Sequence, residues 1–481
     1  MEATDEQHKG TCQDTERSQK STVNHLPDEV LLEIFDSYRQ GADSYDHQWR
    51  WKIVWVNLAH VCRRWRAVVF ASSSRLDLGI TVGHTKPRHI KTILSGPLPI
   101  FIYYRFVYRQ LIGSALWRMR AALKHHDRVR EINFRGRGEH FDKLFKETNC
   151  AFPVLESLVL TSACERELPD TFLGGPDLSY LQLRRLQLEH FSLASISRFL
   201  LSVTTLTDLS LQIDTALGLS PETFLLVCLK GMHLLRRLDL SIFSESPSQH
   251  STPKDIVPLS KLTCFRYRGD VEYLDTLAAG LSAPSLQDVD INFYVLAQLP
   301  IAHLSRFIDE IEEHYHAVHV TFQKWGFRLS LLTQSECINH CKPHFNLGAD
   351  LSDPPISIIG MSRSLPTRLT TVEELRVTFD KADADFWEDF ITWRRFLQQF
   401  PGVKVLRTEG ANNYHIARTL LQDNEEPDGD LDFLPSLEEI ELGTNSSLTP
   451  ESQHGPELAA FEPFISVRQQ AGRPVRVFLG A

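Results

Sequence analysis

Residues 206–211 read LTDLSL, and the same leucine spacing, L-x-x-L-x-L, occurs in LESLVL (155–160), LRRLQL (183–188) and LRRLDL (235–240). Degenerate copies begin at Val129, Leu262, Leu286, Val372 and Leu437. From Val129 to Leu286, successive copies start 26, 28, 23, 29, 27 and 24 residues apart. Six such intervals in succession indicate an internal repeat.

Each copy predicts a short strand, because its last two apolar positions lie two residues apart and point to one side of a strand. A helix after each strand would return the chain, and candidates are FDKLFKET, SLASISRFLLS, PETFLLVCLKGM, VEYLDTLAAGL and HLSRFIDEIEEHY. Stacked copies bury the apolar side that one copy cannot bury alone. The repeat therefore predicts an α/β fold, an irregular leucine-rich-repeat solenoid with a parallel sheet on its concave face.

The interval between Leu286 and Val372 is too long for one repeat. Within it, HAVHVTFQKWGFRLSLL (316–332) predicts two strands about a turn, and PPISIIG (354–360) predicts a third. Either the repeats continue here at altered spacing or a β-hairpin is inserted. A later strand is expected in PGVKVLRTE (401–409), and the acidic stretch DNEEPDGDLD (423–432) is expected to be a solvated loop.

The composition of the 481 residues is that of a soluble globular protein, with 42% hydrophobic and 23% charged residues. A net charge of −10 gives no general attraction to phosphate, so nucleic acid is not expected as a partner. No apolar run is long enough to span a membrane and no signal peptide is recognised, which predicts a cytoplasmic or nuclear protein. The polar residues 1–22 are expected to be disordered, and the eight cysteines are expected to be free thiols.

Motifs for phosphate loops, dinucleotide binding, zinc proteases and serine hydrolases do not occur in the sequence. The nearest approach to a metal site is CINHCKPH, with Cys337, His340, Cys341 and His344 at helical spacing. Pro343 interrupts the last turn, and structural zinc sites usually draw on two separated pairs, so a buried-thiol segment is the favoured interpretation. The sequence therefore predicts no catalytic residues, no metal and no cofactor, and an enzyme is the least favoured class of protein.

The N-terminal stretch VNHLPDEVLLEIFDSY (23–38) predicts a helix that begins at Pro27, with acidic residues in the first turn. Its apolar side is formed by Val30, Leu31, Ile34, Phe35 and Tyr38. A second helical set follows in VNLAHVCRRWRAVVF (56–70), with Val56, Ala59, Val61, Cys62, Trp65 and Val69.

These residues carry a resemblance to the F-box motif, whose pattern runs from L-P-x-E-[IVL]-L to V-C-[RK]-x-W. The matching positions are Leu26, Pro27, Glu29, Val30, Leu31, Ile34, Phe35, Leu58, Val61, Cys62, Arg63, Trp65 and Val68. With the repeats downstream, the chain resembles the F-box/leucine-rich-repeat class, and its tail FEPFISVRQQAGRPVRVFLG is similar to fungal F-box-like proteins. The chain departs from the pattern in a connection (36–60) roughly a dozen residues longer than usual, which contains Trp49, Trp51 and Trp55, and in the absence of a tryptophan from FASSSRLDL.

The resemblance implies a three-helix F-box at 23–72 that docks on a Skp-type adaptor, and through it on a cullin. Residues 73–481 would be a leucine-rich-repeat-like domain that recognises a protein substrate for ubiquitination. The adaptor-binding residues would be Leu26, Pro27, Val30, Leu31, Ile34, Phe35, Val61, Cys62 and Trp65. The alternative is a leucine-rich-repeat interaction scaffold that binds the adaptor without a cullin, or does not bind it at all.

If the leucines of L-x-L point inward, the residues between and beside them face the open side of the sheet. The candidates for substrate binding are Asp239, Arg266, Arg268, Asp288, Asp290 and Arg376. Arg266 and Arg268 would lie between Asp239 on one neighbouring strand and Asp288 and Asp290 on the other. A surface of mixed charge suits a protein or peptide partner better than a polyanion.

Overall fold

The computed structural model describes most of the chain between Leu26 and Leu479. The described residues are 26–43, 48–73, 75–76, 78–82, 97–105, 112–174, 182–214, 221–243, 255–293, 302–309, 315–323, 326–333, 345–350, 369–379, 390–409, 413–421, 434–443 and 454–479. Residues 1–22 and the stretches CINHCKPH, PPISIIG and DNEEPDGDLD lie outside this set. The chain divides into two compact units, Met1–Tyr103 and Tyr104–Ala481.

The first unit contains helices α1 (Asp28–Asp43), α2 (Gln48–Val61) and α3 (Arg63–Ala71). Strand β1 (Ile80–Val82) follows and pairs in parallel with β2 (Ile100–Arg105). Helix α1 begins where predicted, since the Leu31 amide donates to the Pro27 carbonyl at 3.1 Å. Helix α2 contains the three tryptophans of the long connection (36–60), and residues 36–43 of that connection belong to α1.

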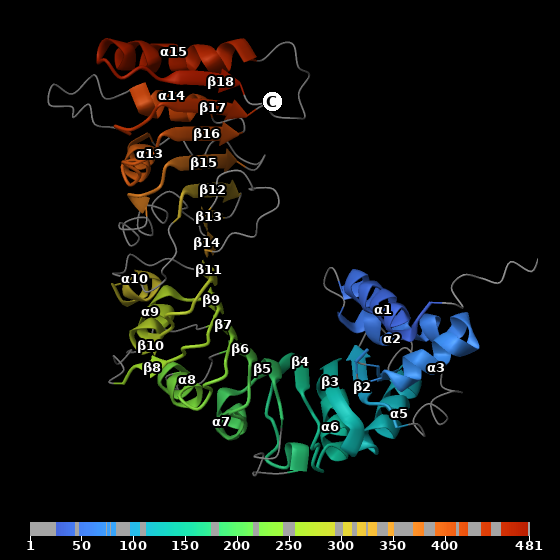
Figure 1. Ribbon diagram of the computed structural model, residues 1–481. Helices are drawn as coiled ribbons and strands as arrows, with labels where there is room; N and C mark the ends of the chain where they lie inside the picture. Colours follow the sequence, from blue (N-terminus) through green and yellow to red (C-terminus); the bar gives the residue numbers. More distant parts are fainter. Residues whose placement is uncertain are drawn as a thin grey trace, which may run out of the picture. The chain divides into compact units, whose positions relative to one another are not determined.

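The second unit is built on a large, mostly parallel sheet (Figure 1). Its strands are β3 (Val129–Gly136), β4 (Ser157–Arg166), β5 (Arg185–Phe191), β6 (Asp208–Asp214), β7 (Arg237–Phe243), β9 (Cys264–Gly269), β11 (Asp288–Phe293), β12 (Ala317–Gln323), β13 (Gly326–Leu332), β14 (Phe345–Asp350), β15 (Glu374–Phe379), β16 (Val405–Glu409), β17 (Glu439–Gly443) and β18 (Arg476–Leu479). Their spatial order is β3-β4-β5-β6-β7-β9-β11-β14-β13-β12-β15-β16-β17-β18. A two-stranded ladder of β8 (Val257–Pro258) and β10 (Leu281–Ser282) lies apart from this sheet.

The repeat determines where the strands begin. Strands β4, β5, β6, β7, β9, β11, β15 and β17 each start at the third position of a copy of the motif. Neighbouring copies pair in register, so that Leu209 of β6 lies between Leu186 and Leu238. These three leucines are buried, which confirms that the paired apolar positions of each copy point into the core.

Helices return the chain between the strands at each of the five predicted places. The helices of the second unit are α5 (Ile112–Leu123), α6 (Gly138–Glu147), α7 (Leu193–Ser202), α8 (Pro221–Leu229), α9 (Val271–Ala279), α10 (Ala302–Asp309), α13 (Phe390–Leu397), α14 (Asn413–Leu421) and α15 (His454–Gln470), with short 3-10 turns η3 (His126–Arg128) and η4 (Phe172–Gly174). Helices α6 to α10, α13 and α14 lie along one side of the sheet (Figure 1). Aromatic rings fill the layer between helices and strands, as where Phe141 of α6 lies 4.7 Å from Phe134 and 5.5 Å from Phe191.

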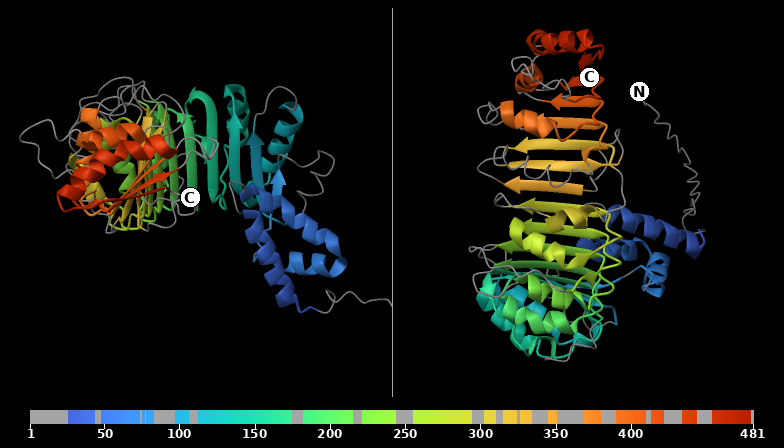
Figure 2. Two further views of the ribbon diagram at one scale, coloured as in Figure 1. Left: turned by 90° about the horizontal axis from the view of Figure 1, so that it is seen from above. Right: turned by 90° about the vertical axis from the view of Figure 1, so that its left-hand side faces the viewer.

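The other side of the sheet carries the residues that alternate with the buried ones, and we call it the row face. Its central row, followed from strand to strand in register, is Asn133, Val159, Gln187, Ser210, Asp239, Arg266, Asp290, Asn346, Ser330, His319, Arg376, Arg407, Glu441 and Phe478. Most of these residues are polar and half-buried. The successive strands that bear them are seen stacked in the second view of Figure 2.

The parallel order is interrupted between β11 and β15. Strands β12 and β13 form an antiparallel hairpin, which confirms the two strands predicted in 316–332. Strand β14 is antiparallel to β13 and parallel to β11, so the three strands lie in the reverse of their order in the sequence. Strand β14 was not predicted, and the strand expected at PPISIIG lies outside the described residues.

The predicted α/β class and the mostly parallel sheet are therefore confirmed. The assignment of the repeats to the leucine-rich-repeat class, with a solenoid, stays a prediction.

Candidate functional site

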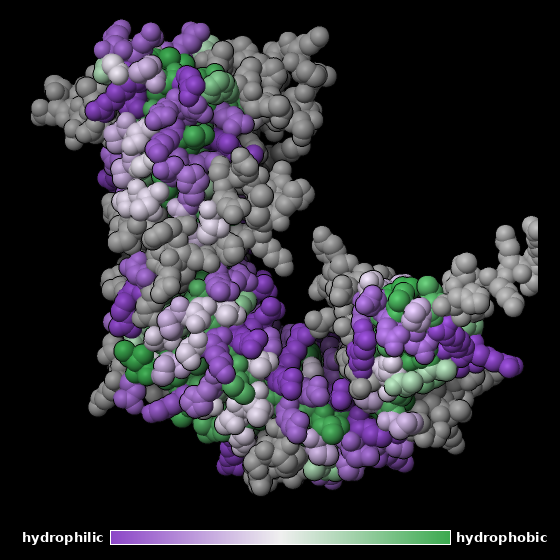
Figure 3. Space-filling model, viewed as in Figure 1, coloured by the Kyte–Doolittle hydropathy of each residue, from purple (hydrophilic) through white to green (hydrophobic). Residues whose placement is uncertain are grey.

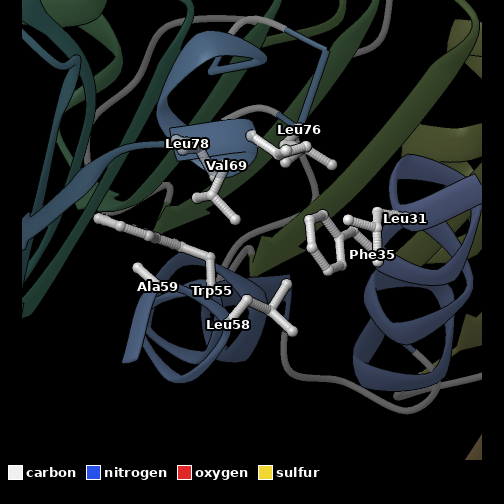
Figure 4. Close-up of a cluster of buried hydrophobic side chains, with 9 residues drawn as sticks. Leu31, Phe35, Trp55, Leu58, Ala59, Val69, Leu76 and Leu78 are labelled. Carbon is white, nitrogen blue, oxygen red and sulfur yellow. The ribbon is translucent and has the colours of Figure 1, made fainter. Parts of the chain in front are cut away.

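The three N-terminal helices enclose a small hydrophobic core (Figure 4). Leu31 and Phe35 of α1 lie one turn apart, both without exposed surface, and pack with Trp55 and Leu58 of α2 and Val69 of α3. The core extends beyond the helices, because Leu76, Leu78 and Leu98 also belong to it or pack against it.

A second apolar set on α1 faces outward. Val30, Ile34 and Tyr38 are 37%, 41% and 44% exposed and lie at i, i+4 and i+8, and we call them the α1 stripe. At 100° per residue the stripe spans about 80° of the helix surface, directly beside the sector that holds Leu31 and Phe35. Figure 3 shows hydrophobic residues at the surface of the N-terminal helices. Helix α1 is therefore apolar over a wider arc than its own core uses.

Hydrogen bonds join the start of α1 to the junction of α2 and α3. The Arg64 guanidinium donates to the Leu26 carbonyl and, at 2.6 Å, to the Asp28 carboxylate. This contact joins the N-terminal end of α1 to the junction that follows α2. Val61, the last residue of α2, is 58% exposed. Val61 and Pro27 are both exposed at the two helix ends that this contact joins.

Cys62 and Trp65 set the position of α3. The Cys62 thiol caps the helix by accepting a hydrogen bond from the Trp65 amide at 3.4 Å. The Trp65 ring meets the Phe35 ring edge to face, with 4.9 Å between centroids. Both residues are half-buried, so each supports the helix packing while keeping part of its surface exposed.

The predicted adaptor-binding residues fall into three groups. Pro27, Val30, Ile34 and Val61 are exposed, Leu26, Cys62 and Trp65 are half-buried, and Leu31 and Phe35 are buried. Side chains without exposed surface cannot touch a partner in this conformation. Leu31 and Phe35 therefore support the surface from beneath and are not part of it.

Two residues of this unit were missed as site or support residues. Tyr38 continues the α1 stripe by one turn, and its helical spacing from Ile34 was the signal for it. Trp55, from the unusually long connection, donates from Nε1 to the Gly79 carbonyl at 3.1 Å and meets the Phe70 ring at 5.8 Å. No sequence signal pairs Trp55 with Gly79, because Gly79 lies outside the motif, immediately before β1, and contributes only its backbone carbonyl.

In the second unit, β9 lies between β7 and β11, as the predicted substrate surface requires. Arg266 is in register with Asp239 on one side and Asp290 on the other, and its guanidinium is 3.9 Å from the Asp288 carboxylate. Burial raises the pKa of the Asp239 carboxyl, while Arg266 and Arg268 act in the opposite direction. The five predicted residues on these strands are therefore neighbours.

Arg376 is not part of that group. It lies on β15, and β14, β13 and β12 separate it from β11. Its neighbours in register are His319 and Arg407. Arg407 is paired with Glu374 at 2.9 Å and with Glu441 at 2.7 Å, an ion-pair group that was not predicted.

The described part of the chain holds no group of three or more histidine, cysteine, aspartate or glutamate side chains placed to bind a metal ion. The described cysteines, Cys62, Cys150, Cys164, Cys228 and Cys264, are free thiols, as predicted. None of the described helices is both long and apolar enough to cross a membrane.

Residues 23–74 match the family model described as F-box-like. The match covers the three helices and the α1 stripe, and its bounds lie close to those predicted for the F-box. No curated protein matches the chain. The first unit thus contains an F-box-like domain, which supports a role in binding the adaptor of Skp/cullin/F-box-type assemblies.

Proposed function

We propose that this protein is the substrate-recognition subunit of a Skp/cullin/F-box ubiquitin ligase. The observation that carries the proposal is the α1 stripe: apolar residues exposed on a helix whose core is already complete, within the F-box-like domain. A contiguous apolar surface of this kind favours a partner that covers it. The partner would be a Skp-type adaptor, which would in turn bind a cullin.

The exposed residues would carry the adaptor contact. Val30 and Ile34 would form its centre, with Pro27 and Val61 at one end of the helix, and the buried Leu31 would hold the helix in place. Because the stripe lies next to the core sector, the adaptor could pack on α1 without opening the unit.

The second unit would hold the substrate. Its row face offers half-buried polar and charged side chains on the side of the sheet opposite to helices α6 to α10, α13 and α14. Paired charges of both signs, such as Arg266 with Asp288 and Arg237 with Asp208 at 3.8 Å, suit a protein partner. In this proposal the chain performs no chemistry of its own.

The second candidate is an interaction scaffold that holds the adaptor without a cullin. The F-box-like match favours this candidate equally, because the exposed surface of α1 would bind the adaptor in both functions and would not contact the cullin. Only the presence of the cullin separates the two functions.

The test is a pull-down of the full-length chain with a purified Skp-type adaptor, with cullin probed in the same eluate. Replacement of Val30 and Ile34 together by aspartate should reduce adaptor affinity at least about 30-fold, because each lies at the centre of the proposed contact. Val227→Asp is the matched control, since Val227 of α8 is 56% exposed outside the F-box-like domain. An unmodified chain that retains no adaptor would exclude the proposal, and adaptor without cullin would select the scaffold.

A further inference from the structure

One row of the row face differs from its neighbours in charge. A second row runs parallel to the central row and is displaced from it by two positions along each strand. From β7 to β15, its residues in register are Ser241, Arg268, Asn292, Gly348, Arg328, Thr321 and Thr378. This row, which we call the Arg268–Arg328 row, contains no carboxylate. The central row beside it contains Asp239 and Asp290 over the same strands.

Neither arginine of this row is held in an ion pair with a described side chain, although Arg268 acts on the Asp239 carboxyl of the central row. Elsewhere on the row face, Arg135, Arg237, Arg266, Arg407 and Arg476 each lie within 4.0 Å of a carboxylate. The side chains of Arg268 and Arg328 form no ion pair or hydrogen bond with any residue that the structure describes, and both are exposed. Their guanidinium groups are therefore available to a ligand.

Between the two arginines the row consists of Asn292 and Gly348. Gly348 lies there without a side chain, and the Asn292 amide leans over it, with Oδ1 3.2 Å from the position that a Cβ of residue 348 would take. The Asn292 amide also has no hydrogen-bond partner among the described residues. An amide with both donor and acceptor capacity suits the backbone of an extended peptide.

The distance between Arg268 and Arg328 determines how far apart two carboxylates of a ligand must lie to pair with both. Arg268 and Arg328 are three strand positions apart, so their Cα atoms are separated by about 14 Å. An extended peptide rises about 3.4 Å per residue, so side chains at i and i+4 are about 13.6 Å apart and point to the same side. Guanidinium groups bind carboxylates in a planar, two-bond geometry that an ammonium group cannot reproduce.

We infer that the Arg268–Arg328 row binds an extended acidic segment of a protein, in which two carboxylate side chains four residues apart pair with Arg268 and Arg328. Asn292 hydrogen bonds to the backbone of that segment above Gly348. The inference rests on the proposal that the second unit holds the substrate, and it gives the chemical class of that substrate. Asp239 and Asp290 in the next row exclude a polyanion, because a uniform chain of phosphates would face them at close range.

The test measures the binding of fluorescent peptides to the full-length protein by anisotropy. The probes are a glycine-serine peptide with glutamates four residues apart, the same peptide with glutamines, one with glutamates two residues apart, and one with a single phosphoserine. The glutamate peptide with spacing four should bind about tenfold more tightly than the glutamine peptide, which corresponds to about 1.4 kcal/mol for two exposed ion pairs.

Replacement of Arg268 and Arg328 together by alanine should reduce the affinity for the spacing-four peptide to that of the glutamine peptide. The matched control replaces Arg198 of α7 and Arg395 of α13, which are also exposed, and should leave the affinity unchanged. The inference would be overturned if the spacing-four glutamate peptide and the glutamine peptide bound equally well, or if the Arg268/Arg328 variant kept the wild-type affinity. It would also be overturned if the spacing-two peptide or the phosphoserine peptide bound more tightly than the spacing-four peptide.

The same Arg268/Arg328 variant should bind the Skp-type adaptor as the unmodified chain does. If the unmodified chain did not distinguish the glutamate from the glutamine peptide but bound the adaptor normally, the acidic-peptide site alone would be refuted. Failure of the unmodified chain to bind the adaptor would refute the proposed function, whatever the peptides do.

Discussion

Trp55 offers a direct test of whether the long connection between the first two motif segments belongs to the core of the helical unit. Replacement by phenylalanine removes the Nε1 donor and leaves the buried Gly79 carbonyl without its 3.1 Å hydrogen bond. A lost buried hydrogen bond costs about 1–2 kcal/mol. The smaller ring also leaves about 40 Å³ unfilled, which at about 24 cal/mol per Å³ adds about 1 kcal/mol. The expected loss is therefore about 2–3 kcal/mol.

Hydrogen exchange of the full-length protein, read by mass spectrometry, localises this loss. Amides of α2 that exchange by opening of the first unit should exchange about 30- to 150-fold faster in Trp55→Phe. Trp117→Phe is the control, because Trp117 is 44% exposed and its replacement should change stability by less than about 0.5 kcal/mol. If the two variants exchanged alike in α2, the assignment of Trp55 to the core would be wrong.

Three other changes test the remaining features. Leu31→Ala should destabilise the first unit by about 2–5 kcal/mol in denaturant unfolding, because it empties a fully buried site, whereas Ile34→Ala should weaken adaptor binding at almost unchanged stability. Gly79→Ala should destabilise the first unit by about 1–3 kcal/mol in the same assay, since the new Cβ would lie 1.7 Å from a ring carbon of Phe101. Burial raises the pKa of the Cys228 thiol to about 12, so at pH 7.5 it stays protonated and should react far more slowly with maleimide than the exposed Cys164, as peptide mass spectrometry would measure.

Gly231→Ala should be tolerated, because its Cβ would meet no atom closer than 3.6 Å, and a loss equal to that of Gly79→Ala would refute the steric argument. Equal loss of stability in the Leu31 and Ile34 variants would contradict the division of α1 into a buried and an exposed sector. Rapid labelling of Cys228 would show that α8 does not protect it.

Most of the sheet could be predicted because the repeat carries its own register. A leucine at a fixed place in each copy determines where a strand starts, and copies of similar length must pair in the same register. This logic gave the strands from β4 to β11 and placed Arg266 between Asp239 and Asp290. It failed at β14, because Phe345–Asp350 contains no copy of the motif and pairs with a strand far earlier in the chain.

The helical unit shows a different limit. The 3.6-residue period identifies the apolar arc of α1, but it does not divide that arc between a core and an outer surface. Leu31 and Phe35 differ from Val30 and Ile34 by one helical position each, and only the packing of α2 and α3 determines which pair is enclosed. Trp55 could be noted as unusual, yet its partner is a backbone carbonyl, which leaves no trace in a sequence.

The reversed order of β12, β13 and β14 bears on how the chain folds during synthesis. Strand β11 presents an edge that its successor in the sequence does not cover, because β14 is its neighbour. The stack that ends at β11 must therefore wait, with unpaired backbone groups, until the ribosome has delivered both strands of the hairpin and β14 after them. Closing so long a segment is entropically costly, so we expect this junction to form late and to open first. A nascent chain arrested before Phe345 should expose that edge to chaperones, whereas a chain released just beyond Asp350 should not.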